Sequence, residues 1–172
     1  MAMTSTMHRF LWDEQASEEL PERLVMWLRQ QGVDAELLRP GVPMPTVQLA
    51  ASAIGVPEEL IIKSLLFISE SGEPVLAIAS GSSKVDRHLL ADAARLSRLR
   101  LADPATVLAL TGFPAGGVAP VGHRTPVPVV MDCSVAAKAF VYGGGGAEDA
   151  LIRIAPRDIA RLTGGLTARI VR

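Results

Sequence analysis

Apolar residues recur along the chain with two different spacings. Between Ser17 and Gln31 they fall at Leu20, Leu24, Trp27 and Leu28, the three- and four-residue spacing of a helix with one buried face. Similar spacing, bounded by capping residues and glycines, predicts four more short helices. They are expected at 46–54, after Asp86, at 103–112 and from about Pro156.

Strand-like apolar runs separate these helices. The run beginning at Leu60 and the run 74–80 flank a turn at 70–74, so residues 63–80 are predicted to form a hairpin. Further strands are expected at 127–131, 138–142, 150–154 and 167–172. Hairpin spacings outnumber strand–helix alternation. The pattern therefore predicts an α+β fold with a curved, mostly antiparallel mixed sheet and flanking helices.

The chain has 172 residues, 49% of them hydrophobic and 20% charged, which fits one domain over residues 1–172 with a sizeable core. Aromatic residues make up only 4%, so the core is expected to be aliphatic and an extended base-stacking platform is disfavoured. A single cysteine excludes a disulfide framework and cysteine-rich zinc modules.

The formal net charge of −1 hides a division along the chain. Residues 1–80 carry 11 acidic and 5 basic residues, whereas residues 81–172 carry 7 acidic and 12 basic residues. Two readings remain open: one basic face for a polyanionic partner, or two solvated surfaces whose charges cancel.

Signals for other classes of protein are absent from the sequence. The N-terminus lacks a signal-peptide pattern, and the longest uncharged run, 104–123, is interrupted by prolines and glycines, so we expect a cytoplasmic protein without a membrane segment. His8, His88 and His123 lack metal-binding spacing, and no nucleophile motif is present. No metal or cofactor is therefore expected.

Two features point to chemistry. Lys63 is one of only three lysines and lies within the apolar run IIKSLLFI, where its ammonium must reach an edge or face a polar cavity that suits an anion. The loop 111–123 combines four glycines with two prolines. Such a loop either presents backbone amides rigidly to a carbonyl or phosphate, or simply forms a tight connection.

Taken in order, these segments resemble the YbaK/EbsC family, relatives of the editing domain of bacterial-type prolyl-tRNA synthetases. The resemblance covers 44–165 and runs through PTVQLAASAIGVPEELIIKSLLF, PVLAIASGSSKVDRHLLADAA, LADPATVLALTGFPAGGVAPVGH, VPVVMDCSVAAKAFVYGGGG and ALIRIAPRDIARLTGG. It implies a β-barrel-like sheet and a metal-independent hydrolase that removes a wrong amino acid from a tRNA in trans, most often a proline tRNA carrying Cys, Ala, Ser or Thr.

The resemblance also implies which residues form the site. Lys63 with the loop residues Gly117 and Val118 would be catalytic. The substrate would be bound by neighbouring positions, namely Ser64, Gly116, Ala119, Pro120, Gly122, Asp132, Gly143 and Gly144. Val118 and Ala119 stand where related cysteinyl-tRNA deacylases often carry small polar residues, which leaves the amino acid open.

The partners implied are a mischarged tRNA and a prolyl-tRNA synthetase, with the oligomeric state undetermined. The basic segment 84–100 is a candidate for tRNA backbone contact, with a solvated helix face as the alternative. Two rival functions are an inactive tRNA-binding module of the same fold and an enzyme acting on another small ester or amide.

Overall fold

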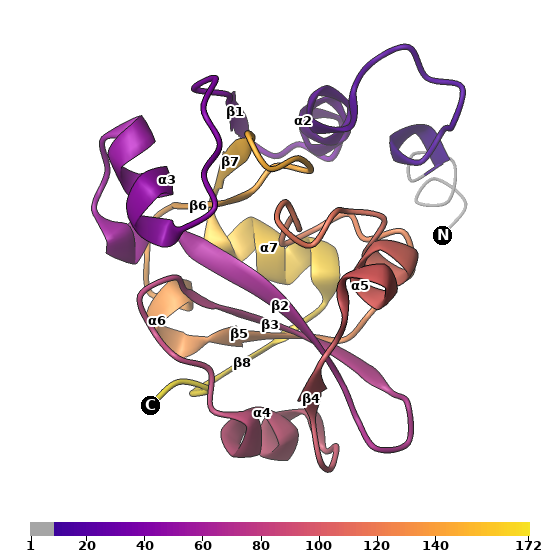
Figure 1. Cartoon of the computed structure of the whole chain (residues 1–172), viewed down its shortest axis with the longest axis vertical. Coiled ribbons are helices and arrows are strands. Elements are labelled where there is room, and N and C mark those ends of the chain that lie inside the picture. Colours follow the sequence, from indigo (N-terminus) through magenta and orange to yellow (C-terminus); the bar gives the residue numbers. More distant parts are fainter. Residues whose placement is uncertain (1–8) are drawn as a thin grey trace.

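A computed structural model describes residues 9–172, in which two β-sheets are flanked by short helices (Figure 1). The helices are α2 (Leu20–Gln30), α3 (Val47–Ile54), α4 (Arg87–Ala94), α5 (Pro104–Thr111), α6 (Cys133–Ala136) and α7 (Pro156–Thr163), with a 3-10 turn η1 (Glu58–Leu60). The strands are β1 (Glu36–Leu38), β2 (Ile62–Ile68), β3 (Pro74–Ser80), β4 (Arg100–Leu101), β5 (Val129–Asp132), β6 (Val141–Gly144), β7 (Leu151–Ile154) and β8 (Leu166–Ala168).

The larger sheet has the strand order β4-β2-β3-β5-β8 and the smaller one the order β1-β7-β6. Pairing is antiparallel except where β5 lies parallel to both β3 and β8. The expected α+β class and mostly antiparallel sheet are thus confirmed. The two sheets meet at an isolated bridge between Ile61 and Tyr142 and do not close on each other, so the term barrel-like applies only loosely.

The predicted hairpin is formed by β2 and β3, paired from Ile62 with Ser80 to Ile68 with Pro74. Successive side chains of β2 point to opposite faces of the sheet. Ile62 and Leu66 join the large core cluster, whereas Phe67 joins a smaller cluster under α4. Both faces of this hairpin are therefore buried, in agreement with its nearly continuous apolar run.

The expected helix caps are present at three helices. Thr46 accepts a hydrogen bond from the amide of Leu49, Asp86 caps α4, and Asp103 accepts from the amide of Thr106 at 2.8 Å. The first helix, in contrast, begins at Leu20 and not near Ser17. Pro21 lies in its first turn, the part of a helix where proline costs no hydrogen bond.

The strand expected at 138–142 is displaced toward the glycine run and becomes β6. The short helix α6, which Asp132 caps, ends at Ala136 and is followed by a turn over 137–140, so the strand starts only at Val141. Gly143 and Gly144 are therefore strand residues, and the turn toward β7 begins after them. Within residues 9–172, no helix is long and apolar enough to cross a membrane.

Candidate functional site

Lys63 is the second residue of β2 and is partly buried. Its ammonium donates to the backbone carbonyls of Gly81, at 3.4 Å, and Ser83, in the segment that follows β3. Among residues 9–172 no carboxylate forms an ion pair with it. Burial lowers the pKa of Lys63 from its ordinary value, because desolvation disfavours the charged form. The positive charge is thus held by carbonyl dipoles, and no carboxylate of residues 9–172 neutralises it.

Asp132 lies on the same face of the sheet as Lys63. Lys63 of β2 pairs with Ala79 of β3. On the other side of β3, Ile78 pairs with Met131 of β5, and the same parallel register places the next residue, Asp132, beside Ala79. Directly paired residues share a face, so the two side chains stand two strand spacings apart, about 10 Å. A basic and an acidic group therefore flank the centre of this sheet face.

Asp132 is 2% exposed, and protein donors engage both of its carboxylate oxygens. It accepts hydrogen bonds from the amide of Ile170 at 2.8 Å and from the amide and hydroxyl of Ser134. Burial alone raises the pKa of Asp132, but these hydrogen bonds outweigh it and hold the pKa below its ordinary value. The carboxylate thus fixes the C-terminal segment and the start of α6.

The glycine/proline loop lies on the other side of β2, between α5 and β5. Its residues Gly117, Val118, Ala119 and Pro120 are buried, whereas Gly116 is exposed. The amide of Gly117 donates to the carbonyl of Pro114 at 2.8 Å, a tight turn at the start of the buried stretch. The loop is therefore a tightly turned and largely buried segment.

The loop is packed directly against β6 and the turn after it. The amide of Gly146 donates to the carbonyl of Gly117 at 2.9 Å. A Cβ atom on Gly144 would lie 2.2 Å from the carbonyl oxygen of Val118, and one on Gly117 would lie 2.7 Å from the nitrogen of Ala147. Glycine is required at both positions because backbone approaches backbone there.

The amides of Val118 and Ala119 find no acceptor among residues 9–172. Both residues are nevertheless buried, at 7% and 0% exposure. Buried amides are normally paired, and pairs of free ones at a rigid turn are suited to bind an oxyanion. The loop thus carries two donors that no described acceptor uses.

The structure brings Lys63, Ser64, Pro120 and Gly143 together at the start of β2, on two faces of it. Gly116 and Gly122 lie beside other parts of the chain, and Asp132 ends β5. Gly143 would contact both Ile62 and Pro120 with a Cβ atom, so the loop and β6 lie beside the start of β2. Strand alternation directs Ser64 toward this side and Lys63 toward the Gly81–Ser83 side. The Ser64 hydroxyl is buried without a hydrogen-bond partner in the described structure. No recorded hydrogen bond links the Lys63 ammonium to the loop.

Two residues that no sequence pattern indicates hold this region in place. Arg39, at the end of β1, donates to Glu19 at 2.7 Å, to Glu22 at 2.9 Å and to Asp149 at 3.2 Å. These bonds, the one to Glu19 first, raise the pKa of Arg39 above its ordinary value. Because Asp149 ends the turn that supports the loop, Arg39 anchors that turn. The partners are far apart in sequence, and no local pattern signals them.

The second missed residue is Trp12, near the start of the described chain. Its indole nitrogen donates to the carbonyl of Gly122 at 3.0 Å, and its ring fills the space where a Cβ atom of Gly112 would be. Gly122 has a φ of +77° and Gly112 a φ of +78°, both in the left-handed region that favours glycine. Trp12 therefore packs against both ends of the loop.

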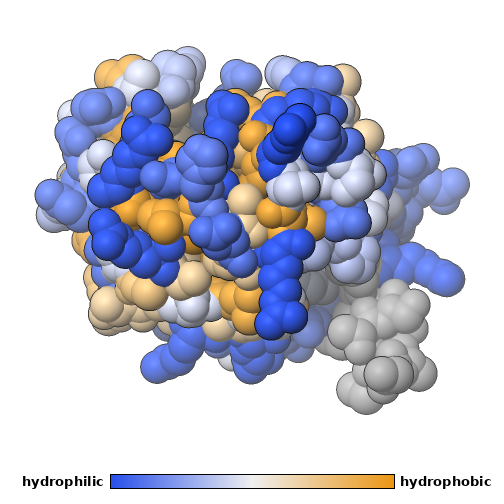
Figure 2. Space-filling model, turned by 90° about the horizontal axis from the view of Figure 1, so that it is seen from below, coloured by the Kyte–Doolittle hydropathy of each residue, from blue (hydrophilic) through white to orange (hydrophobic). Residues whose placement is uncertain are grey.

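The basic segment 84–100 forms α4 and its flanks, on the lower side of the molecule in Figure 1. Figure 2 shows this face from below, with hydrophilic side chains set among apolar ones. The five basic residues are all exposed, namely Lys84, Arg87, Arg95, Arg98 and Arg100. Lys84 directly follows Ser83, which holds the Lys63 ammonium. The basic face thus begins next to Lys63.

Comparison with known proteins gives a consistent family signal. A family model described as an aminoacyl-tRNA editing domain matches residues 42–162. YwhH of Bacillus subtilis, an uncharacterised protein, is 30% identical over 118 residues, which is 69% of this chain and 74% of YwhH. A proline–tRNA ligase of Nitratidesulfovibrio vulgaris is 32% identical over 119 residues, 69% of this chain but only 20% of the ligase, so the chain spans about a fifth of that enzyme.

Two further relatives carry names that bear on activity. EbsC of Enterococcus faecalis, whose name proposes a Cys-tRNA(Pro)/Cys-tRNA(Cys) deacylase, is 25% identical over 73% of this chain and 76% of its own length. A solved structure described as a proposed trans-editing enzyme for prolyl-tRNA synthetase superposes with a TM-score of 0.81 at 33% identity. That superposition covers 91% of this chain and 99% of the other.

Proposed function

The chain belongs to the aminoacyl-tRNA editing domain family, and from this we infer that it is a trans-editing aminoacyl-tRNA deacylase. The resemblance drawn from the sequence motifs over 44–165 is confirmed by the family match over 42–162. The substrate we propose is a proline tRNA carrying a small wrong amino acid such as Cys, Ala, Ser or Thr. Its source would be a prolyl-tRNA synthetase in the cytoplasm, with which the enzyme would cooperate.

The reaction is hydrolysis of the ester between the amino acid and the terminal ribose of the tRNA. A water oxygen attacks the ester carbonyl carbon, and the carbonyl oxygen becomes an oxyanion. The bond to the ribose oxygen then breaks, the proton of the water passes to that oxygen, and free amino acid and tRNA are released. An ester of this kind is already reactive, so positioning and charge stabilisation suffice.

The observation that carries this proposal is that two unused backbone N–H donors of the loop and the ammonium of Lys63, which no described carboxylate neutralises, lie around the same strand, β2. We assign the amides of Val118 and Ala119, with the turn at Gly117, to the oxyanion. Lys63, whose charge no described carboxylate balances, would hold a phosphate or developing negative charge near the terminal adenosine. A donor of the first kind is typically worth roughly 10²–10³ in rate.

The remaining predicted positions surround these groups. Ser64 and Pro120 would line the amino-acid side of the site, together with the backbone of Gly116, Gly122, Gly143 and Gly144. Asp132 would hold neighbouring segments in place and would not bind the substrate directly, because protein donors already engage both of its oxygens. An apolar amino-acid pocket of a synthetase distinguishes two amino acids that differ by one methylene group by only roughly 10- to 200-fold. Hydrolysis of the wrongly charged tRNA after aminoacylation provides the additional selectivity.

The test is hydrolysis of a panel of proline tRNAs charged with Ala, Cys, Ser or Thr. We expect the wild-type protein to release at least one of these amino acids, and Lys63→Ala to lose most of that activity. Arg29→Ala removes an exposed positive charge from α2 and serves as the matched control with wild-type rates. Turnover of none of these tRNAs by the wild type would refute the deacylase, and binding without turnover would favour an inactive tRNA-binding module.

A further inference from the structure

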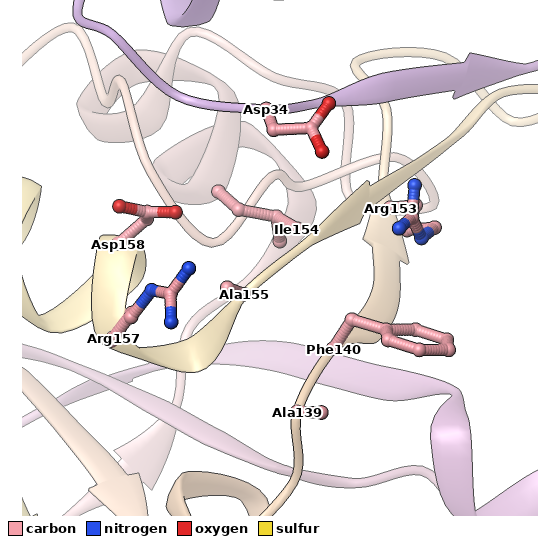
Figure 3. A pocket seen from close by; sticks show the side chains of 8 residues that line it. All are labelled: Asp34, Ala139, Phe140, Arg153, Ile154, Ala155, Arg157 and Asp158. Carbon is pink, nitrogen blue, oxygen red and sulfur yellow. The ribbon is translucent and has the colours of Figure 1, made fainter.

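A small polar cavity lies outside the site described above, between β7, the start of α7 and the segment before β6 (Figure 3). We call it the Phe140–Arg153 pocket. Its volume is about 110 Å³. It is lined by Phe140, two arginines and two aspartates, together with aliphatic atoms of residues 154 and 155. The reaction proposed above uses none of these side chains.

Phe140 is the one aromatic residue among the large hydrophobic side chains exposed in the described part of the chain, at 37% exposure. The guanidinium carbon of Arg153 lies 4.9 Å from the centre of its ring. Arg153 is also held by Glu36 at 3.5 Å, so its guanidinium is oriented from two directions. The guanidinium therefore lies over one face of the ring. Unpaired bases stack on guanidinium groups as well as on aromatic rings, so the pair offers a stacking platform.

The rest of the pocket provides both kinds of hydrogen-bonding group. Figure 3 shows Arg157 and Asp158 entering it from the start of α7 and Asp34 from the segment before β1. Arg157 and Asp34 are exposed, and Asp158 has only a weak contact to Arg161, at 3.5 Å. Carboxylates accept from an exocyclic amino group and guanidinium groups donate to ring nitrogens and carbonyls. Cytosine and adenine offer an amino group next to such an acceptor, whereas uracil lacks the amino group.

The pocket is connected to the proposed reaction site by direct contacts. The rings of Phe140 and Tyr142 meet edge to face with their centres 6.0 Å apart. Tyr142 is bridged to Ile61, two residues before Lys63 on the same stretch of chain. By strand geometry this path brings Phe140 to within about 15 Å of Lys63. A few unpaired nucleotides bridge that distance.

We propose that the Phe140–Arg153 pocket binds an unpaired, amino-bearing nucleobase of the tRNA acceptor end while the aminoacylated terminal nucleotide lies at Lys63. This inference rests on the proposed function and extends it, because it assigns a second contact to the same substrate. The base stacks on the Phe140–Arg153 platform, and Asp34, Arg157 and Asp158 read its edge. The low aromatic content of the chain, 4%, agrees with stacking of a single base and not with an extended surface on which several bases stack.

The experiment measures binding of a short single-stranded RNA ending in CCA, against the same RNA with both cytosines replaced by uracil, by fluorescence anisotropy. We expect wild type to prefer the cytosine form and Phe140→Ala to bind it roughly 5- to 100-fold more weakly, the range found for loss of one stacking contact. Phe140→Tyr should restore binding. Leu108→Ala, an exposed apolar residue of α5, is the matched control.

Steady-state deacylation of a charged tRNA provides the second readout. Phe140→Ala and Arg157→Ala should raise KM and leave kcat close to the wild-type value, because the contact is remote from the ester. Arg157 is exposed, so its loss leaves the fold intact. Equal binding of both RNAs by wild type, or an unchanged KM in both variants, would overturn the pocket. Absence of deacylation by wild type would instead refute the proposed function, and the RNA-binding result would still decide the pocket.

Discussion

The indole nitrogen of Trp12 donates a hydrogen bond to the carbonyl of Gly122, which lies 110 residues further along the chain. The same ring packs edge to face on Phe113, at a centre distance of 5.0 Å, and Arg124 lies over it at 5.3 Å. Trp12 lies outside residues 42–162, the part that matches the family. A segment beyond the family match therefore holds both ends of the proposed oxyanion loop.

Substitutions at Trp12 should be graded in their cost. Trp12→Phe removes the donor and part of the ring beside Gly112, and it is expected to lower the free energy of unfolding by about 1–2 kcal/mol. Trp12→Ala also opens the space beside Gly112 and should cost about 3 kcal/mol. Urea denaturation measures both values, and deacylation by Trp12→Ala should show a reduced kcat because the loop is less rigid. A wild-type kcat in a folded Trp12→Ala protein would contradict the positioning role.

The glycines around the loop should differ sharply in what they tolerate. Gly144→Ala places a Cβ atom 2.2 Å from the Val118 carbonyl oxygen, so backbone must move, and we expect a loss of about 2 kcal/mol or more in unfolding free energy. Gly116→Ala meets only the flexible Glu148 side chain, at 3.2 Å, and should retain wild-type stability. Thermal unfolding of the two variants checks this. Equal melting temperatures would show that the tight approach at Gly144 is not required.

The sequence predicts local structure well where capping residues and strand periodicity act together. The hairpin 63–80 and the caps Thr46, Asp86 and Asp103 agree with the structure because their signals lie within a few residues. The first helix and β6 were misplaced by a few residues, because Pro21 and the short helix α6 decide those boundaries. Arg39 and Trp12 were missed altogether, because their partners come from distant parts of the chain.

The site follows the same division. The motif resemblance places Lys63 and the glycine loop on neighbouring elements, as the structure does. It does not tell on which side of β2 the loop packs, or that protein donors already engage Asp132. Those features depend on tertiary packing and on the approach of the C-terminal segment, neither of which has a local signature.

The charge of Lys63 should make binding of the acceptor end sensitive to alkaline pH. Desolvation lowers the pKa of Lys63 below 10.5, so the ammonium deprotonates earlier than an exposed lysine as the pH rises. We expect the affinity for uncharged tRNA to fall between neutral pH and that value. Lys63→Arg keeps its charge throughout this range and should not show this step. Anisotropy titrations from pH 7 to pH 10 distinguish the two, and identical profiles would remove Lys63 from the binding site.

Asp132 should contribute to stability in a manner that depends on acid pH. Because the pKa of Asp132 is held below its ordinary 3.8, ionised Asp132 stabilises the fold above that pH, and this stability is lost as the pH falls through the lowered pKa. Asp132→Asn should be destabilised by about 1–3 kcal/mol at pH 7, since an amide cannot accept from all three donors. The difference from wild type should shrink below pH 3.8, measured by denaturation at a series of pH values. A difference that is constant with pH would contradict the assignment of these hydrogen bonds to the carboxylate.

Arg95 combines an exposed charge with an unfavourable backbone conformation. It caps the C-terminus of α4 with a φ of +56°, a position where glycine is usually preferred. Arg95→Gly should therefore raise the free energy of unfolding by about 1 kcal/mol. If the basic segment contacts the tRNA backbone, the same change should weaken tRNA binding and reduce its salt dependence by about one unit of slope.

Arg29→Ala again serves as the control, because it removes one exposed charge far from the basic segment along the chain. Its tRNA affinity and salt slope should match those of wild type. A stabilised Arg95→Gly protein with unchanged affinity and slope would identify the segment 84–100 as a solvated helix face. A stabilised protein that binds tRNA more weakly would mean that this arginine is kept at a cost in stability because its charge is used.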